Sequence, residues 1–188
     1  MTEVVLFHHA QGQTPGFLEF ADDLRAAGHL VHAPDLYDGH VFTELHEGVA
    51  FAEAVGFDEI IVRGVAAAER VPAAVVYAGF SLGLLPAQAL TQTRPGARGA
   101  VLFHGAVPAA EFEHPWPEGV PLQMHVMEGD PWGDVHVCRA LAEQVPSAEL
   151  FVYPGSGHLF ADSGSGDYEP ECALLLMART LTFLREVA

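Results

Sequence analysis

The sequence has 188 residues, of which 50% are hydrophobic and 18% are charged; this is typical of a folded protein, and we expect a single domain over residues 1–188. Its 25 acidic and 8 basic residues give a formal charge of −17, which argues against nucleic acid or an anionic membrane as a partner. No signal peptide is visible, and Cys138 and Cys172 show no disulfide or ligand spacing, so we expect a cytoplasmic protein with free thiols.

Short apolar runs alternate with segments of helical periodicity along the whole chain. In chain order they predict a strand (4–7), a helix (17–24), a strand (29–33), a helical region (44–70), a strand (73–78), a helix (84–93), two strands (100–103 and 122–127), a helix (135–145), a strand (149–153) and a helix from 169 to the end. Gly48, Gly56 and Gly64 are expected to divide the long helical region into two or three short helices.

This alternation predicts the fold class. Apolar strands that alternate with helices indicate an α/β fold with a mostly parallel, doubly wound sheet and helices on both faces. Right-handed crossovers bring every strand-to-helix loop to one edge of such a sheet. The polar residues in those loops are therefore expected to converge there: His9, Ser81, His104, Asp130 and His158.

The strand at 73–78 continues into Gly79-Phe80-Ser81-Leu82-Gly83 and then into a helix. This strand-turn-helix context is typical of a nucleophile elbow, in which the serine lies on a strained turn and the glycines avoid backbone collisions. The alternative is a turn in which Ser81 only caps the helix.

The polar loops provide the partners that a serine nucleophile needs. A serine hydroxyl requires a base, and the base requires an acceptor that orients it. We expect His158, in the loop after the last strand, to be the base, and Asp130 to orient it; Asp134 is the competing acid, which we interpret as a helix cap.

The loop after the first strand is expected to complete the site. The N–H groups of Ala10 and Leu82 are the predicted oxyanion donors, with Gln11 nearby and His9 pointing into the pocket. Phe80 and Phe160 are candidate pocket walls, although each is equally compatible with the core. No metal site and no cofactor are expected, because the histidines lack ligand spacing.

Together these residues resemble the dienelactone hydrolase family of α/β-hydrolases, and the resemblance covers nearly the whole chain. The segment Tyr153-Pro154-Gly155-Ser156-Gly157-His158-Leu159-Phe160 is the most family-specific one, and Glu128-Gly129-Asp130-Pro131 also matches. The resemblance supports Asp130 and His158. It implies a short, capless α/β-hydrolase domain that hydrolyses esters or lactones without a cofactor.

Three positions depart from the pattern that the resemblance implies. The family's usual nucleophile is cysteine, and this chain has Ser81; the usual glutamate of the first loop is matched by His9. The two changes agree, because a serine has no resting thiolate for a carboxylate to activate. A substrate-binding arginine is replaced by Asp162, which would repel a substrate carboxylate, so we expect a neutral ester or lactone.

The leading hypothesis is therefore a serine hydrolase of carboxylic esters or lactones that acts through an acyl-enzyme intermediate. Acyl transfer or perhydrolysis by the same triad is an alternative, and so is a non-catalytic relative that binds a small ligand or a protein. Residues 4–7 are expected to form an exposed sheet edge, which a second subunit in a homodimer would cover.

Overall fold

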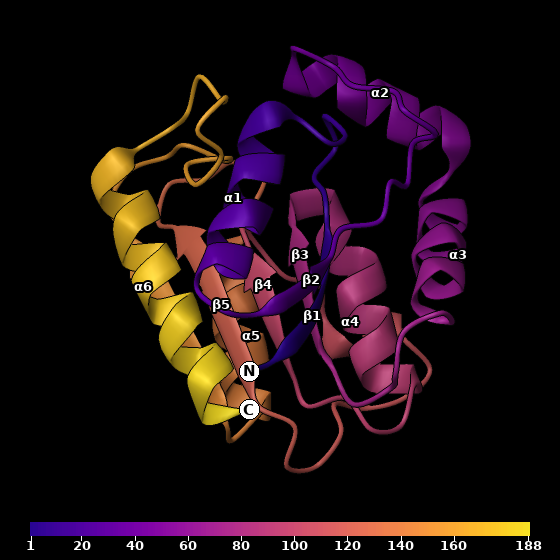
Figure 1. Cartoon of the computed structure of the whole chain (residues 1–188). Helices are drawn as coiled ribbons and strands as arrows, with labels where there is room; N and C mark the ends of the chain where they lie inside the picture. The colour runs from indigo at the N-terminus through magenta and orange to yellow at the C-terminus, as the bar shows by residue number, and fades with distance from the viewer.

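The computed structural model describes all 188 residues and contains one six-stranded sheet in which every neighbouring pair of strands is parallel (Figure 1). The spatial order of the strands is β2-β1-β3-β4-β5-β6. In chain order the strands are β1 (Glu3–Phe7), β2 (Leu30–His32), β3 (Val76–Phe80), β4 (Gly99–Phe103), β5 (Leu122–Met127) and β6 (Ala148–Tyr153). The predicted parallel α/β sheet is confirmed.

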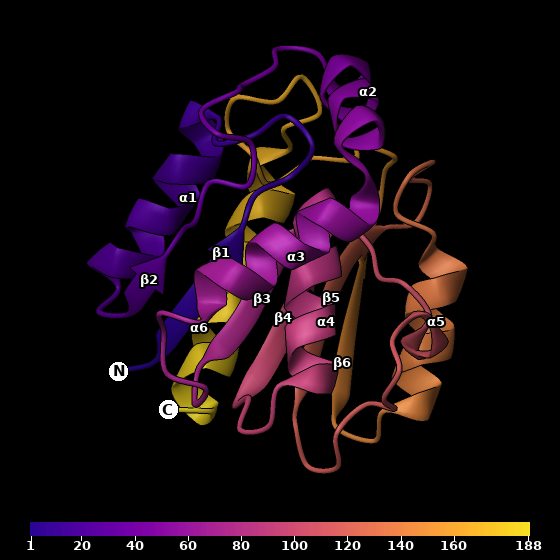
Figure 2. The same ribbon diagram turned by 90° about the vertical axis from the view of Figure 1, so that its right-hand side faces the viewer.

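Helices cover both faces of this sheet, as the alternation of strands and helices predicts. They are α1 (Pro15–Ala26), α2 (Leu45–Val55), α3 (Phe57–Ala68), α4 (Leu84–Thr93), α5 (Val135–Gln144) and α6 (Pro170–Glu186), with short 3-10 helices η1 (Ser81–Gly83) and η2 (Ala109–Glu111). Figure 2 shows α3 and α4 in front of the sheet and α5 at its right, with α1 and α6 behind it and α2 at the end where the strands terminate. Helix α5 shares one hydrophobic core with α3 and α4. No helix combines the length and the apolar character that a bilayer crossing requires.

The pleat of each strand divides its side chains between two hydrophobic cores. In β1, Val4 and Leu6 pack with α1 and α6, whereas Val5 and Phe7 pack with α3, α4 and α5. All four side chains are at most 1% exposed. Burial on both faces explains why the strands are continuous apolar runs rather than alternating ones.

The long helical region forms two helices, and only Gly56 separates them. Gly56 has a positive φ of 95° between α2 and α3, a conformation that glycine adopts without strain. Gly48 and Gly64 lie inside α2 and α3. The expectation of two or three short helices is therefore met with two.

The expectation of an exposed edge at residues 4–7 is wrong. Strand β1 lies between β2 and β3, with Val4 paired to Val31 on one side and to Val76 on the other. The first crossover places the next strand on the outer side of β1, so the sheet edges are β2 and β6. Because β1 is not an edge strand, it gives no reason to expect a homodimer that pairs through β1.

The turn from β3 into α4 places Ser81 at the carboxyl edge of the sheet. Strand β3 extends to Phe80, beyond the predicted end, because Gly79 and Phe80 still pair with β4. Two close approaches then require glycine: a Cβ on Gly79 would overlap the Gly83 carbonyl, and a Cβ on Gly83 would overlap the Phe7 carbonyl. The glycines of the G-x-S-x-G pattern thus let the turn pack against β1.

We predict that Gly83→Ala lowers the free energy of unfolding by about 1–3 kcal/mol, the usual cost of overpacking a rigid interior. The neighbouring atoms of Gly83 are backbone and have little room to retreat. Urea denaturation measures the change. Gly166→Ala is the matched control, because nothing lies within 4 Å of its added Cβ; equal stability of the two variants would contradict the packing argument.

Candidate active site

Ser81, His158 and Asp130 form one continuous chain of hydrogen bonds at the carboxyl edge of the sheet. Ser81 Oγ lies 2.6 Å from His158 Nε2, and His158 Nδ1 lies 2.8 Å from Asp130 Oδ2. Because a carboxylate only accepts, Nδ1 carries the proton and Nε2 is left to accept from the Ser81 hydroxyl. This geometry suits removal of the serine proton by His158.

Each member of this chain is held by its surroundings. Asp130 is 9% exposed and His158 is 4% exposed, and the second oxygen of Asp130 accepts the Trp132 N–H at 2.9 Å. The backbone N–H of His158 donates to Asp167 Oδ2 at 3.0 Å. Ser81 has a left-handed φ of 48°, a strained conformation for a residue with a side chain. The strain aims Oγ at His158.

Asp134 lies apart from His158 and caps a helix. Its Oδ1 accepts the N–H groups of His136 and Val137, both at 3.2 Å, at the start of α5. These contacts agree with its interpretation as a capping residue. The structure thus places Asp130, and not Asp134, against the imidazole.

The predicted oxyanion donors are Leu82, directly after Ser81, and Ala10, in the loop after β1. Leu82 is the second residue of η1, so its N–H has no partner inside that helix. Ala10 donates none of the backbone hydrogen bonds formed outside helices and strands. Neither N–H group donates a hydrogen bond in the loops of the protein, which is compatible with the predicted role.

The Gln11 side chain is bound to backbone carbonyls of the protein itself. Its N–H donates to His9 Nδ1 at 3.2 Å, and its side-chain amide donates to the carbonyls of Phe42 and Thr43 at 3.2 and 2.6 Å. The side chain thus fixes the segment before α2. The structure assigns it this contact in place of the expected substrate contact.

His9 and Asp162 are both buried and form a pair with each other. His9 Nε2 lies 2.7 Å from Asp162 Oδ2, and the two side chains are 0% and 1% exposed. Burial alone would raise the pKa of Asp162, but hydrogen bonds from His9, Thr14 and the Gly164 N–H bring it below its usual value. Contrary to expectation, His9 does not point into an open pocket, and Asp162 does not face a substrate.

The two candidate wall residues, Phe80 and Phe160, belong to the core. Both are 0% exposed. Phe80 packs edge-on against Phe20 of α1, with 4.8 Å between ring centroids. The alternation of β3 turns Phe80 toward α1 together with Val76 and Ala78, so of the two interpretations the core one holds.

His104 is a site neighbour to which the sequence assigned no role. It follows β4, has a left-handed φ of 69° and is 1% exposed. Its ring lies 6.0 Å from that of His158 and 4.8 Å from that of Phe160, and neither ring nitrogen has a hydrogen-bond partner. Its place after a strand was the only available signal.

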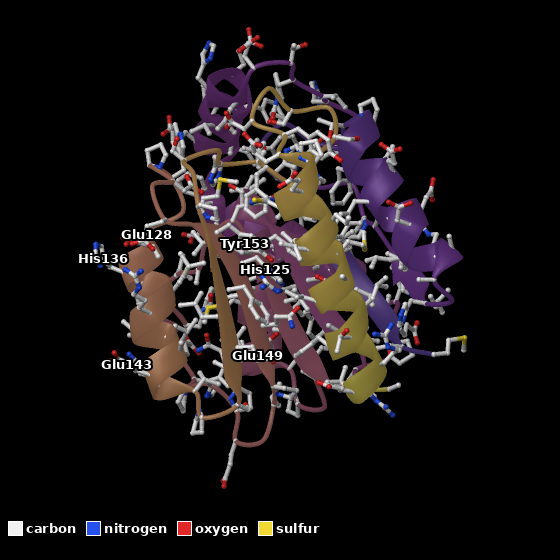
Figure 3. All side chains as sticks on the ribbon, turned by 90° about the vertical axis from the view of Figure 1, so that its left-hand side faces the viewer. His125, Glu128, His136, Glu143, Glu149 and Tyr153 are labelled. Atoms are coloured by element: carbon white, nitrogen blue, oxygen red, sulfur yellow. The ribbon has the colours of Figure 1, made fainter.

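Burial keeps several histidines of this protein neutral. It lowers the pKa of His125 to about 3, with Arg179 adding to the effect, although His125 Nδ1 has a partner in the Tyr153 hydroxyl at 2.8 Å (Figure 3). Burial also lowers the pKa of His104 well below its usual value, and His158 adds to the shift. These groups take up protons on unfolding.

We predict that Asp134→Ala lowers the free energy of unfolding by about 1 kcal/mol, the cost of a lost helix cap, and leaves ester turnover unchanged. Asp130→Ala is expected to remove nearly all turnover, because His158 loses its orienting acceptor. Urea denaturation and assays on an activated ester measure both variants. Loss of turnover in the Asp134 variant would reverse the assignment.

We predict that acid destabilises the protein through its buried histidines. Below pH about 6.5 the unfolded chain binds protons that folded His104 does not bind, so stability is full above that pH and is lost as pH falls. His104→Phe should therefore reduce the slope of the free energy of unfolding against pH by up to about 1.4 kcal/mol per pH unit. Urea unfolding from pH 7 to pH 5 measures it, and identical slopes would contradict it.

Comparison with known proteins identifies the family. Residues 1–188 match the family model described as "Dienelactone hydrolase family". A Bradyrhizobium sp protein named "Probable 2-oxo-3-(5-oxofuran-2-ylidene)propanoate lactonase" is 30% identical over 150 residues, which are 77% of this chain and 54% of that protein. A protein from Azospirillum brasilense named "Putative carboxymethylenebutenolidase" is 35% identical over 69 residues, 35% of this chain and 30% of that one. The chain thus spans about half, or less, of these relatives.

Solved structures show the same fold at lower identity. A dienelactone hydrolase-like promiscuous phosphotriesterase from metagenomic libraries has a TM-score of 0.77 at 18% identity, with 100% of this chain and 87% of that chain covered. Thermogutta terrifontis esterase 2, phosphonylated by cyclosarin, has a TM-score of 0.72 at 16% identity, with 100% and 83% covered. The fold is that of an α/β-hydrolase, and the chain belongs to the dienelactone hydrolase family.

Proposed function

We propose that the protein hydrolyses uncharged carboxylic esters or lactones with Ser81 as the nucleophile, His158 as the base and Asp130 as the orienting acid. The observation that carries the proposal is the hydrogen-bonded chain from Ser81 through His158 to Asp130, with 2.6 and 2.8 Å between the bonded atoms. A purely binding domain would have no need of the strained φ of 48° at Ser81, which costs on the order of 1–3 kcal/mol.

The geometry supports a two-step acyl transfer to water. His158 Nε2 accepts the Ser81 proton as Oγ attacks the acyl carbon, and Asp130 stabilises the imidazolium that forms. The Ala10 and Leu82 N–H groups hold the oxyanion. His158 then gives its proton to the departing alkoxide, and a water attacks the acyl-serine with His158 again as the base. The products are the carboxylic acid and the alcohol, or one hydroxy acid from a lactone.

The relatives support the choice of substrate bond. The Bradyrhizobium protein is named a lactonase and the Thermogutta protein is named an esterase. Lactones and esters both present an acyl carbon that a serine can attack, so one site can serve both. They differ only in that the leaving oxygen of a lactone stays attached to the acyl group.

The charges around the site favour an uncharged substrate, for a reason that differs from the one expected. Asp162 is buried against His9, so it cannot repel a substrate directly. No arginine is bonded to the triad: Arg139 pairs with Glu128 at 2.7 Å and Arg63 with Asp38 at 3.1 Å, and no hydrogen bond joins an arginine to Ser81, His158 or Asp130. A substrate carboxylate would therefore find no cation to offset its desolvation.

Trp132 is the proposed contact of the substrate's leaving group. Trp132 is 56% exposed, and its ring lies 6.3 Å from that of His158, which makes it a wall for the leaving group in an open, capless site.

Both cysteines are free, which supports a cytoplasmic location.

We predict that Ser81→Ala lowers kcat on an activated neutral ester by at least about 10⁴-fold, as loss of a triad nucleophile does. A fluorophosphonate should add one adduct to the wild type, mapped by mass spectrometry to the Ser81 peptide, and none to the variant. Circular dichroism verifies that the variant is folded. Unchanged turnover in the variant would reject the proposal, as would a folded wild type that forms no adduct.

Product analysis separates hydrolysis from acyl transfer. With a competing alcohol present, we expect the free acid to remain the main product. A dominant new ester would show instead that the acyl-serine prefers an acceptor other than water.

A further inference from the structure

We propose that Asp162 and His9 form a positioning pair that holds the oxyanion donor of the first loop in register with Ser81 and His158. This inference rests on the proposed function and adds two residues to its machinery. Neither touches the reacting atoms. They act through the backbone on either side of the site.

The first observation is that the protein has built a cradle for the Asp162 carboxylate. Its Oδ2 accepts from His9 Nε2 at 2.7 Å and from the Thr14 hydroxyl at 2.6 Å, while Oδ1 accepts the Gly164 N–H at 2.7 Å. The carboxylate is 1% exposed and contacts no arginine. A buried charge without a counter-ion is tolerated only when hydrogen bonds satisfy it.

The start of α1 completes this cradle. Thr14 caps the helix through its hydroxyl, which accepts the Phe17 N–H at 3.2 Å while it donates to Asp162. A Cβ on Gly16, in the first turn, would overlap Asp162 Oδ1. The carboxylate therefore occupies space left open at the positive end of the helix dipole.

The second observation is that both ring nitrogens of His9 are committed. Nδ1 accepts the Gln11 N–H at 3.2 Å, so in this hydrogen-bond pattern Nε2 carries the proton and donates it to Asp162. The anion thereby selects the tautomer that can accept from Gln11. The Gln11 N–H is therefore engaged with His9, whereas the N–H of the preceding residue, Ala10, donates no loop hydrogen bond.

The third observation is where the pair lies in the chain. Asp162 follows His158 by four residues, and its N–H closes a turn onto the Leu159 carbonyl at 3.0 Å. His9 directly precedes Ala10. The pair thus connects the loop of the base to the loop of the oxyanion donor across 153 residues of sequence. Two apolar side chains of this size would stabilise the fold about as well as His9 and Asp162 do. Stability therefore does not account for a polar pair here, and positioning does.

Asp162→Asn is the decisive substitution. If its amide oxygen keeps the Gly164 N–H, its NH₂ group faces His9 and forces the imidazole into the other tautomer. The proton on Nδ1 then opposes the Gln11 N–H and displaces the loop. We expect kcat to fall about 10- to 100-fold with KM changed less than about two-fold, since small misplacements of catalytic groups have costs of this size.

Two readouts separate positioning from a merely structural role. The fluorophosphonate reaction at Ser81 should slow by the same factor as kcat, because it needs the same oxyanion donors. Nitrogen-15 NMR of the His9 ring should show the proton move from Nε2 to Nδ1. Asp23→Asn, which removes one exposed charge from α1 at a side chain with no hydrogen-bond partner, is the matched control and should change neither.

A double-mutant cycle tests the coupling. In His9→Asn, the side-chain oxygen takes the place of Nδ1 and accepts the Gln11 N–H without help from Asp162. Asp162→Asn should therefore cost less in the His9→Asn background than in the wild type, by at least about three-fold in kcat. Additive losses would overturn the proposal.

If wild type forms the Ser81 adduct and Asp162→Asn reacts at the same rate, the positioning pair is rejected and the proposed function stands. If wild type forms no adduct, the proposed function itself fails. Should Asp162→Asn not fold, His9→Asn and His9→Phe decide: we expect the former to react about 10-fold faster, and equal rates would reject the pair.

Discussion

The left-handed turn at Ser81 is the constraint on which the rest of the structure depends. A serine in this conformation is held only because β3 is paired on both sides and α4 packs against the sheet directly after the turn. The turn fixes where Oγ lies, and every other group of the site has to reach that point. The base, its acid and the first loop do so from β6, β5 and β1, whose carboxyl ends share the same edge.

Buried polar groups at this edge differ in how well they are satisfied. Asp130, Asp162 and His9 have partners for their hydrogen-bonding atoms, so their burial costs little and restricts their positions. His104 has none for its ring nitrogens, which costs on the order of 1–3 kcal/mol. The protein tolerates this beside its triad because two apolar cores on the faces of the sheet supply the stability.

Much of this arrangement could be predicted because it follows from local patterns. Continuous apolar runs give buried parallel strands, and the position of a residue just after such a strand brings Ser81, Asp130 and His158 to one edge. The sequence left Phe80 compatible with both a pocket wall and the core, because the predicted strand ended at Ala78; once the strand includes Gly79, the pleat turns Phe80 inward with Ala78. The order of strands and the contact between His9 and Asp162 carry no local signal, since both depend on the path of each crossover.

The contact between His9 and Asp162 also constrains how this sequence can change. The resemblance implies a glutamate at the first position and an arginine at the second, whereas this chain has a histidine and an aspartate there. A glutamate introduced alone at position 9 would place two carboxylates together in a buried site, and an arginine alone at 162 would face a histidine and an N-terminal helix end. Either single step leaves an uncompensated buried charge, at a cost of about 3–5 kcal/mol. Each of the two side chains is therefore suited to its buried site only while its present partner stays in place.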